Sequence, residues 1–578
     1  MKVKIITTIE ELPKLSANEP TFCDIETEQL YVGTRLIQFY QPTTDDTIYI
    51  FDVAPLGYSQ KDYDNILEQV KNYLKPLHTV WYNASYDLGT LNFVTNKVDD
   101  LFYAIKTAYC QFIEFNLDKV VDKLGFGHLY NSLDKKSLQK AGFKKGAYLS
   151  QAQITYSATD VYALSLMWKD PKVQAVIENN LAYQVDMLSQ IYAVQYQQNG
   201  LLVDLSKRES MLTQSISDIE RLRKEFPIGF NPNSYKQVRE YLGVEESDHD
   251  ALVIYSLSDN ELAGKAASLI ELKRALKEKS YLESINYDKM YTKFNVAGAA
   301  TGRFTSSGGD LPNGFNAQQI PRRFQPLFKA DTETTTVVGL DYSTLELRLA
   351  CAIFDELEMY RQLKDGEDLH TSMAIASTGK ELHPDGLLGS DYDTIHDASN
   401  KGTKFVTKTD RTLAKSINFG YVFGMSAKTY QNYAFVSYGV KVSLEESTNL
   451  RNKYFTKYPG IKKYHEYVWN NYHKPSFFYE TALGRRVKPK LGTDGINGPV
   501  QGSGAETTKL AVHFLIKEYP EALKLIFNVV HDAIYLRVLK EEESLWRDRL
   551  AKAMVKGWTE ISKSKLFKFK DIPMPVDE

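Results

Sequence analysis

The sequence is poor in cysteine: Cys23, Cys110 and Cys351 are the only three in 578 residues, and they lie far apart. This spacing indicates neither a disulfide framework nor a zinc site, and it favours a reducing compartment. No apolar run approaches the ~20 residues that cross a bilayer. The first residues, MKVKIITTIEELPKL, also lack the apolar core of a signal peptide. We therefore expect a cytoplasmic protein with no membrane partner.

The sequence also lacks an excess of charge of one sign. It has 70 basic and 73 acidic residues, a formal net charge of −3, whereas a nucleic-acid-binding domain is often strongly basic. A surface that binds a polyanion must therefore consist of local basic patches, such as residues 271–281 and 484–490. Such a patch is more often an ordinary solvated helix face or loop. At this length several domains are expected.

Four acidic positions stand out in the N-terminal third. Asp24 and Glu26 in TFCDIETEQL are two apart on an expected strand, so their side chains face the same side. Asp87 follows a second β-rich run, in VWYNASYDLGTL, and Tyr156 and Asp160 are one helical turn apart in QITYSATDVYALSLMW. Each segment alone is typical of an ordinary solvent-exposed face. Together, four carboxylates supply the oxygen ligands that two divalent cations require.

In this order and spacing, the segments resemble the proofreading 3′–5′ exonucleases of the DEDD superfamily, in their Tyr-containing subclass. The resemblance implies a ribonuclease-H-like exonuclease domain over residues 1–185 that degrades a single-stranded DNA 3′ end. Two Mg²⁺ or Mn²⁺ ions would be needed. Asp24, Glu26 and Asp160 would hold one ion, and Asp24 and Asp87 the other. Tyr156 would orient the attacking water.

A second pair of acids follows from two distant strands. The buried run 337–340 predicts a strand that ends at Asp341, followed by a helix with Ser343 as a cap for Glu346. In NVVHDAIYLRV, two apolar runs predict a β-hairpin with Asp532 at its tip. Taken alone, Asp532 is compatible with an ordinary turn residue or with half of a metal site. Two acids at the ends of separate strands form a minimal two-metal site for phosphoryl transfer.

The segment RTLAKSINFGYVFGMS, between these acids in the sequence, predicts a helix. Arg411, Lys415 and Phe419 repeat every four residues and therefore share one face. Two cations and an aromatic ring on one stripe suit a triphosphate with its base or sugar. A structural helix with two exposed basic residues is the alternative.

Nearly the whole chain resembles a family A DNA polymerase. DYSTLELR, RTLAKSINFGYVFG and VHDA are similar to the family's three motifs, and TGRF, NAQQIP, DLHTSMA, ALGRRV and NGPVQGSG occur around them in the family's order. The resemblance implies an α/β multidomain protein with a right-hand polymerase domain over residues 186–578. The expected parts are a thumb at about 186–295, a palm at about 296–355 and 480–578, and fingers at about 356–479. The lack of a 5′-nuclease segment resembles compact, bacteriophage-like forms, and an extra segment at 379–404 has no role that we can name.

By this resemblance, Asp341 and Asp532 would bind two catalytic Mg²⁺ or Mn²⁺ ions, with the carbonyl of Tyr342 completing one site. The reaction would add dNTPs to the 3′-hydroxyl of a primer on a DNA template. A helicase or a single-strand-binding protein is a further expected partner, and a monomer is the expected state. Two other function classes stay open: an exonuclease with a lapsed polymerase module, and a non-catalytic primer-terminus binding protein.

The resemblance also implies how the nucleotide is held. Arg411, Lys415 and His370 would bind the triphosphate, and Lys415 would donate a proton to pyrophosphate. Phe419 would pack on the incoming sugar, and Glu346 would fill the space that a ribose 2′-hydroxyl needs.

The primer-template contacts and the departures from the family complete the expectations. The residues implied at the minor-groove side of the primer terminus are Arg303, Asn497, Gln501 and His531. Ala533 stands where the family usually has Glu, and Phe423 where it has a Tyr whose hydroxyl braces the sugar-gate Glu. Thr493 stands where an Arg is usual. These departures bear on fidelity and sugar selection, and leave the catalytic pair intact.

Overall fold

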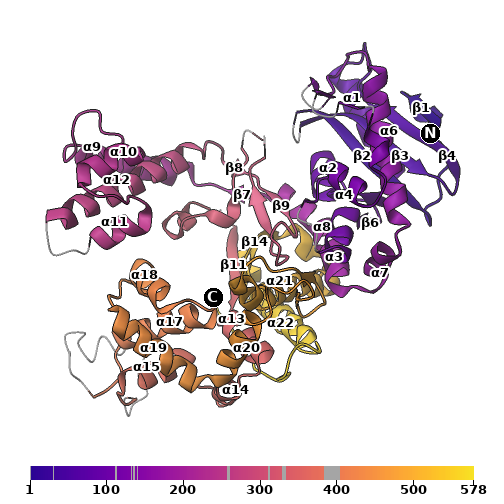
Figure 1. Ribbon diagram of the computed structural model, residues 1–578. Coiled ribbons are helices and arrows are strands. Elements are labelled where there is room, and N and C mark those ends of the chain that lie inside the picture. The colour runs from indigo at the N-terminus through magenta and orange to yellow at the C-terminus, as the bar shows by residue number, and fades with distance from the viewer. Residues whose placement is uncertain are drawn as a thin grey trace.

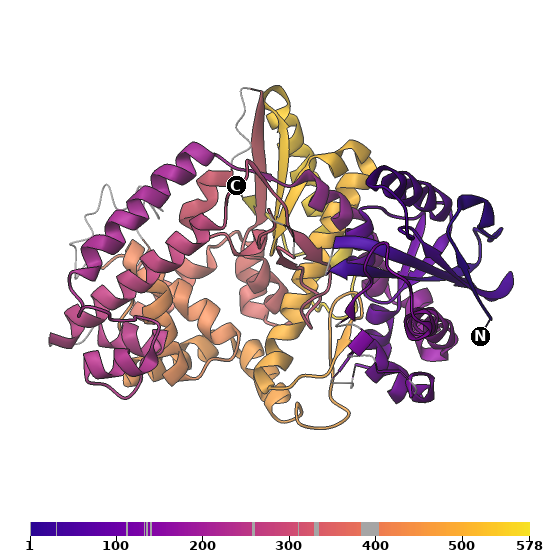
Figure 2. The same cartoon turned by 90° about the horizontal axis from the view of Figure 1, so that it is seen from above.

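Figure 1 shows a computed structural model of the chain, and Figure 2 shows it from above. The structure describes residues 2–29, 32–110, 114–131, 133–134, 137–138, 141–256, 261–309, 311, 313–328, 334–382 and 404–577. Most of the extra segment predicted at 379–404 lies outside the described residues. Within the described ranges, no helix has both the length and the apolar character that a bilayer crossing needs.

The N-terminal part is built on a six-stranded mixed sheet in the order β1-β4-β3-β2-β5-β6. Strand β2 pairs antiparallel with β3 and parallel with β5. The strands are β1 Lys2–Ile6, β2 Pro20–Gln29, β3 Val32–Gln41, β4 Asp45–Asp52, β5 His78–Trp81 and β6 Lys97–Asp100. The helices around them are α1 Gln60–Leu74, α2 Ala84–Leu91, α3 Leu101–Ala108, α4 Leu117–Lys123, α6 Gln151–Trp168 and α7 Pro171–Asn179.

Alternation along β2 divides the side chains between two cores. Phe22 packs in the core that contains α6, whereas Cys23 and Ile25 pack in the core that contains α1 and α2. Because side chains alternate along a strand, Asp24 and Glu26 share the face of Phe22. The strand therefore presents both acids to α6.

A helical arm follows helix α8 (Leu181–Asn199). Its helices are α9 Leu205–Arg223, α10 Tyr235–Leu242, α11 His249–Tyr255 and α12 Glu261–Glu283. Apolar residues such as Leu222, Val238 and Leu269 form a separate core among these helices. In Figure 2 the arm and the six-stranded sheet stand on opposite sides of the central part.

The central part contains a four-stranded antiparallel sheet in the order β14-β15-β11-β16. Its strands are β11 Thr335–Tyr342, β14 Ile526–Val530, β15 Ala533–Leu539 and β16 Val576–Asp577. Val338 and Leu340 of β11 are buried in the core shared with helices α21 (Gly492–Glu518) and α22 (Glu543–Ile561). By alternation, Asp341 points from the opposite face.

Short ladders and helices surround this sheet. The two-stranded ladders pair β7 Leu201–Leu202 with β8 Lys289–Met290, β9 Lys293–Asn295 with β10 Thr305–Ser307, and β12 Tyr479–Glu480 with β13 Arg486–Val487. The helices are α13 Leu345–Phe354, α14 Leu357–Lys364, α15 Leu369–Thr378, α17 Lys408–Val422, α18 Ala427–Tyr438, α19 Leu444–Lys457 and α20 Pro459–Trp469. A capping box of Thr407 and Asp410 begins α17 and satisfies backbone NH groups of its first turn.

Candidate active sites

A cavity of about 600 Å³ lies where β11 and the β14–β15 hairpin meet α15 and α17. Its lining combines carboxylates with basic side chains, as a site for a metal-bound polyphosphate requires. The sequence-predicted residues that line it are Arg303, Asp341, Tyr342, Glu346, His370, Arg411, Lys415, Phe419, His531 and Asp532. Three predicted residues do not line it: Phe423, at the C-terminal end of α17, and Asn497 and Gln501, one turn apart on α21.

The hairpin places Asp532 beside Asp341. Val530 pairs with Ala533, so His531 and Asp532 form a two-residue turn. His531 has a φ of 56°, a left-handed conformation that tight hairpin turns require and usually assign to Gly or Asn. The carboxyl of Asp341 is close to that of Asp532, and partial burial together with this neighbour raises the pKa of Asp341 to about 7. The predicted hairpin tip is thus also the second half of an acidic pair.

Basic and aromatic side chains enter the cavity from α15 and α17. Arg411 forms an ion pair with Asp368 at 2.5 Å. His370 is buried, and burial lowers its pKa to about 4. Its Nδ1 accepts a hydrogen bond from the Asn418 amide at 2.9 Å, which leaves Nε2–H as the donor of a neutral ring. Lys415, one turn after Arg411, points into the same cavity.

Glu346 is held by Arg303 in an ion pair of 2.5 Å. The predicted cap of its helix was wrong: Thr344, not Ser343, is the N-cap of α13, with a φ of 50° and no side-chain capping bond. A left-handed N-cap turns the chain sharply between β11 and α13 without a side-chain acceptor. The hydroxyl of Tyr342 donates to the carbonyl of Met554, so that side chain belongs to the core.

A buried ion cluster fixes the loop that carries Arg303. Asp186 on α8 accepts hydrogen bonds from Arg485 at 2.5 Å and from Lys509 at 2.6 Å. Lys509 also donates to the carbonyl of Gly302 at 2.7 Å. Gly302 has a φ of 84°, and a Cβ there would lie 2.5 Å from the Arg485 guanidinium. Only glycine therefore fits, and the cluster ties α8 to the cavity.

A second group of acids lies between β2 and α6. Carboxylate oxygens of Asp24, Glu26 and Asp160 all lie within 4.8 Å of one another. Ser157 donates to Glu26 at 3.3 Å, and the hydroxyl of Tyr130 donates to Asp160 at 2.6 Å. Burial first, and then the charges of Asp24 and Asp160, raise the pKa of Glu26 well above its usual range.

Asp87 and Tyr156 adjoin this group from two helices. Asp87 is buried on α2, and burial followed by the charge of Asp24 raises its pKa. Asn83, the N-cap of α2, has a φ of 67°. Tyr156 lies one turn before Asp160 on α6 and is also buried.

Both groups of acids fit divalent cations. The donors are carboxylate oxygens, which Mg²⁺ and Mn²⁺ prefer. In the described part of the chain, the buried Oδ1 of Asp87 has no hydrogen-bond partner. Like charges held this close are costly without a counter-charge. Asp24, Glu26, Asp160 and Asp87 would hold ions at one site, and Asp341 and Asp532 at the other.

Sequence reasoning missed Tyr130 and Asp577. Tyr130 lies far from the acidic motifs in the sequence, and nothing in its surroundings marks it as a partner of Asp160. Asp577 lines the cavity of Asp341 because β16 pairs with β11, and a two-residue strand leaves no periodic pattern to recognise. The cluster around Asp186 was also missed, because an ion pair between distant segments gives no local signal.

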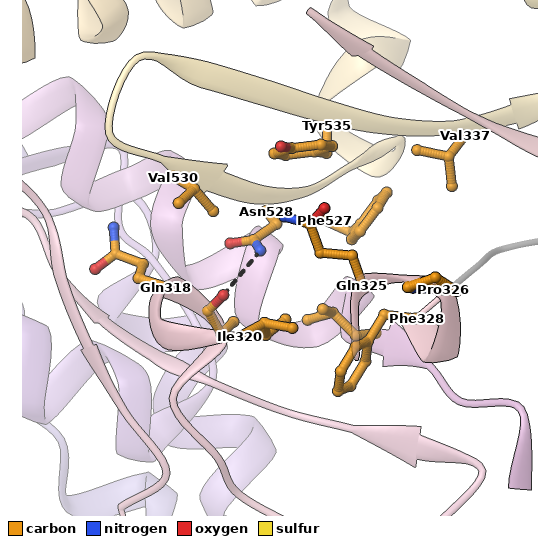
Figure 3. A pocket seen from close by; sticks show the side chains of 12 residues that line it. Gln318, Ile320, Gln325, Pro326, Phe328, Val337, Phe527, Asn528, Val530 and Tyr535 are labelled. Atoms are coloured by element: carbon orange, nitrogen blue, oxygen red, sulfur yellow. Dashed lines mark hydrogen bonds between the residues drawn. The ribbon is translucent and has the colours of Figure 1, made fainter. Parts of the chain in front are cut away.

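A separate cavity of about 390 Å³ lies against the hairpin (Figure 3). The rings of Phe328, Phe527 and Tyr535 form much of its wall, and among the residues that the structure describes no charged side chain lines it. Asn528 donates to the carbonyl of Ala317 at 3.3 Å, the dashed bond in Figure 3. The described lining of this cavity shares no residue with that of the acidic cavity. Its aromatic walls support the strands that carry Asp532.

Comparisons with known proteins point to one family. The profile described as DNA polymerase family A matches residues 203–384 and 392–577. The chain is 28% identical over 597 residues to DNA polymerase I of Aquifex aeolicus (strain VF5), covering 95% of this chain and 93% of that protein. It is 25% identical over 398 residues to the thermostable DNA polymerase I of Thermus aquaticus, covering 62% of this chain and 44% of that protein. The chain thus spans less than half the length of the Thermus relative.

A solved structure shares the fold. The POL domain of Pol1 from M. smegmatis, in complex with DNA primer-template and dNTP, aligns with a TM-score of 0.69 and 18% identity. The alignment covers 96% of this chain and 94% of that one.

The raised pKa of Asp341 predicts a pH-dependent cost in metal-free protein. An unfolded Asp ionises near pH 3.9, whereas folded Asp341 keeps its proton up to about pH 7. Between these values the folded state binds more protons, so this group lowers stability as pH rises. In chelator, Asp341→Asn should raise the apparent melting temperature by about 1–3 °C at pH 8 and by less at pH 5. Mg²⁺ should stabilise the wild type more than the variant. An equal gain from Mg²⁺ in both proteins would contradict the metal assignment.

Proposed function

This chain belongs to DNA polymerase family A and is a template-directed DNA polymerase, and we propose that it also removes nucleotides from DNA 3′ ends at a second site. The predicted family, right-hand fold and polymerase function are confirmed. One cavity is lined by Asp341 and Asp532 together with Arg411 and Lys415. This observation supports placing the polymerase reaction at these residues. The exonuclease rests on the acidic group of β2 and α6, outside the profile match.

Asp341, Asp532 and the carbonyl of Tyr342 are the proposed metal ligands for dNTP addition. At either site, bound Mg²⁺ or Mn²⁺ would lower the pKa of the attacking oxygen and offset the charge of the phosphate. The hairpin and β11 hold the two carboxylates in place before substrate arrives, so little reorganisation is needed when the ions and the nucleotide bind.

Arg411, Lys415 and His370 are the proposed triphosphate ligands. Arg411 offers a planar fork suited to phosphate oxygens. Lys415 lies one turn further along α17, and would give its proton to the leaving pyrophosphate. His370 is neutral at pH 7 because burial lowers its pKa to about 4, so it binds phosphate as an uncharged donor.

Phe419 and Glu346 are the proposed contacts of the sugar of the incoming nucleotide. Phe419 lines the cavity from the same face of α17 as Lys415 and would pack against the deoxyribose. Glu346 would occupy the space of a 2′-hydroxyl. Phe423 has no hydroxyl to brace Glu346, but the ion pair with Arg303 supplies another brace.

The primer-template would lie beside this cavity. The proposed contacts are Arg303, Asn497, Gln501 and His531. Donors on these side chains can form hydrogen bonds with the minor-groove acceptors that all base pairs share. Such contacts depend on the geometry of the base pair rather than on its sequence.

The exonuclease site would bind a single-stranded 3′ end. Asp24, Glu26 and Asp160 would hold one ion, and Asp24 and Asp87 the second. Tyr156 would orient the attacking water, while Tyr130 holds Asp160 in position. The two carboxylate groups share no residue, so the two reactions need separate binding of the DNA end.

The remaining assignments concern organisation and setting. We assign the exonuclease domain to residues 1–185 and the polymerase domain to 186–578, with the thumb, palm and fingers at the ranges expected from the sequence. The site of action would be the cytoplasm or nucleoid, or the host cytoplasm for a phage-encoded enzyme. A monomer working with a helicase or a single-strand-binding protein is the proposed state.

Asp24→Ala combined with Glu26→Ala should abolish 3′–5′ degradation because the first metal site loses two of its ligands. Extension should stay within about twofold of wild type, as expected for independent sites. Both reactions can be followed on one labelled primer-template. Loss of extension in a variant with unchanged melting temperature would show that the sites are not independent.

Asp532→Asn should lower primer extension by roughly 10³-fold or more, because a neutral amide cannot replace an anionic metal ligand. Degradation in the absence of dNTPs should persist. Asp548→Asn, on the exposed surface of α22, is the matched control and should change neither reaction. Near-normal extension by Asp532→Asn would remove this residue from the catalytic site.

Glu346→Ala should increase ribonucleotide insertion, relative to dNTP insertion, by about 10- to 100-fold, since a hydroxyl-sized space opens beside C2′. Glu346→Gln keeps the bulk and should stay close to wild type. Single-nucleotide insertion kinetics with rCTP and dCTP measure the ratio. Equal ratios for wild type and Glu346→Ala would place the sugar gate elsewhere.

A further inference from the structure

The polymerase hairpin lacks a carboxylate that its motif usually carries. The third motif reads VHDA, so Ala533 follows Asp532. Ala533 is the first residue of β15, and its methyl group is buried. The hairpin therefore supplies one acid to the cavity, and any further carboxylate must come from another part of the chain.

Strand β16 brings such a carboxylate to the cavity. Asp577 pairs directly with Asp341 in the antiparallel ladder of β11 and β16. Residues directly opposite each other in an antiparallel pair point to the same face, with Cβ atoms about 4.5–5.5 Å apart. Asp577 also lines the cavity together with Asp341 and Asp532.

Contacts on three elements hold the segment that ends in β16. Arg348, the last residue of the DYSTLELR motif, donates to the carbonyl of Pro573 at 2.6 Å. The backbone NH of Ser343 donates to the carbonyl of Pro575 at 3.0 Å, and the indole of Trp558 donates to Ile572 at 2.8 Å. The residues that hold the segment thus belong to the loop and helix after Asp341, and to α22.

Electrostatics agree with this placement. The basic residues that line the same cavity are Arg303, Arg348, Arg411 and Lys415. Arg303 pairs with Glu346, Arg348 also holds the β16 segment, and Arg411 and Lys415 are the groups that a triphosphate would engage. The cavity is also lined by Glu346, Asp368 and Glu367, which form ion pairs with Arg303, Arg411 and Arg361. The remaining acids, Asp341, Asp532 and Asp577, form a group whose negative charge divalent cations can offset.

We propose that Asp577 supplies the third carboxylate of the polymerase metal site, in the place that a Glu at position 533 would otherwise fill. The inference rests on the proposed metal role of Asp341 and Asp532. Mg²⁺ commonly keeps several waters and is oriented by carboxylates around them, so Asp577 can act through a bound water. It would raise metal affinity and help to position the ions for the primer hydroxyl.

Metal binding by the protein alone tests this without relying on activity. In the Asp24→Ala/Glu26→Ala background, free Mn²⁺ is titrated by electron paramagnetic resonance. Asp577→Asn should weaken Mn²⁺ binding about 10- to 100-fold, the usual effect of losing a supporting carboxylate, and should slow primer extension by a similar factor. Asp571→Asn is the matched control, because Asp571 lies in the same segment but pairs with Lys364 on the surface.

A rescue variant separates a metal role from a structural one. Adding Ala533→Glu to Asp577→Asn should restore both Mn²⁺ affinity and extension most of the way, since a carboxylate returns to the same cavity. If Asp577→Asn leaves the Mn²⁺ affinity unchanged while Asp341→Asn clearly lowers it, the proposed role of Asp577 is wrong and the metal site at Asp341 stands. Unchanged affinity in Asp341→Asn as well would overturn the metal site itself.

Discussion

The close approach of like-charged carboxylates is the constraint on which both candidate sites depend. In one part of the chain Asp24, Glu26 and Asp160 lie within 4.8 Å of one another, and in another Asp341 adjoins Asp532. Such groups repel, and burial makes the charged forms costlier still. They stay together because strands, a tight turn and packed helices leave them no other position. Binding of the proposed cations would offset this repulsion at each site.

Constrained backbone turns and buried ion pairs hold the elements that carry these carboxylates in place. The left-handed His531 directs Asp532 from its turn, and the aromatic walls of the cavity in Figure 3 support the strands behind it. Asp186, Arg485 and Lys509 fasten helix α8 to the loop of Gly302. One buried carboxylate with two cationic partners thereby links the N-terminal part to the polymerase cavity, and removing either cation would leave a buried charge without its full compensation.

Much of the geometry of the candidate sites could be predicted from sequence because it is local. Alternation along β2 put Asp24 and Glu26 on one face, and helical spacing put Arg411, Lys415 and Phe419 on one stripe. The features that the sequence did not predict depend on contacts between distant segments. The cap of α13 is Thr344 rather than Ser343, since the turn after β11 is set by tertiary packing. The pair of Arg303 with Glu346, the bond from Tyr130 to Asp160 and the register of Asp577 against Asp341 leave no periodic or compositional trace.

We propose that one chain carries two independent metal-dependent sites acting on the same DNA end. The most direct test follows one 5′-labelled primer, annealed to a longer template, with wild-type protein and Mg²⁺. With all four dNTPs the primer should lengthen to the template end, and without dNTPs the same protein should shorten it one nucleotide at a time. Excess chelator should stop both. Shortening without any lengthening, or a retained primer that changes length in neither condition, would contradict the account.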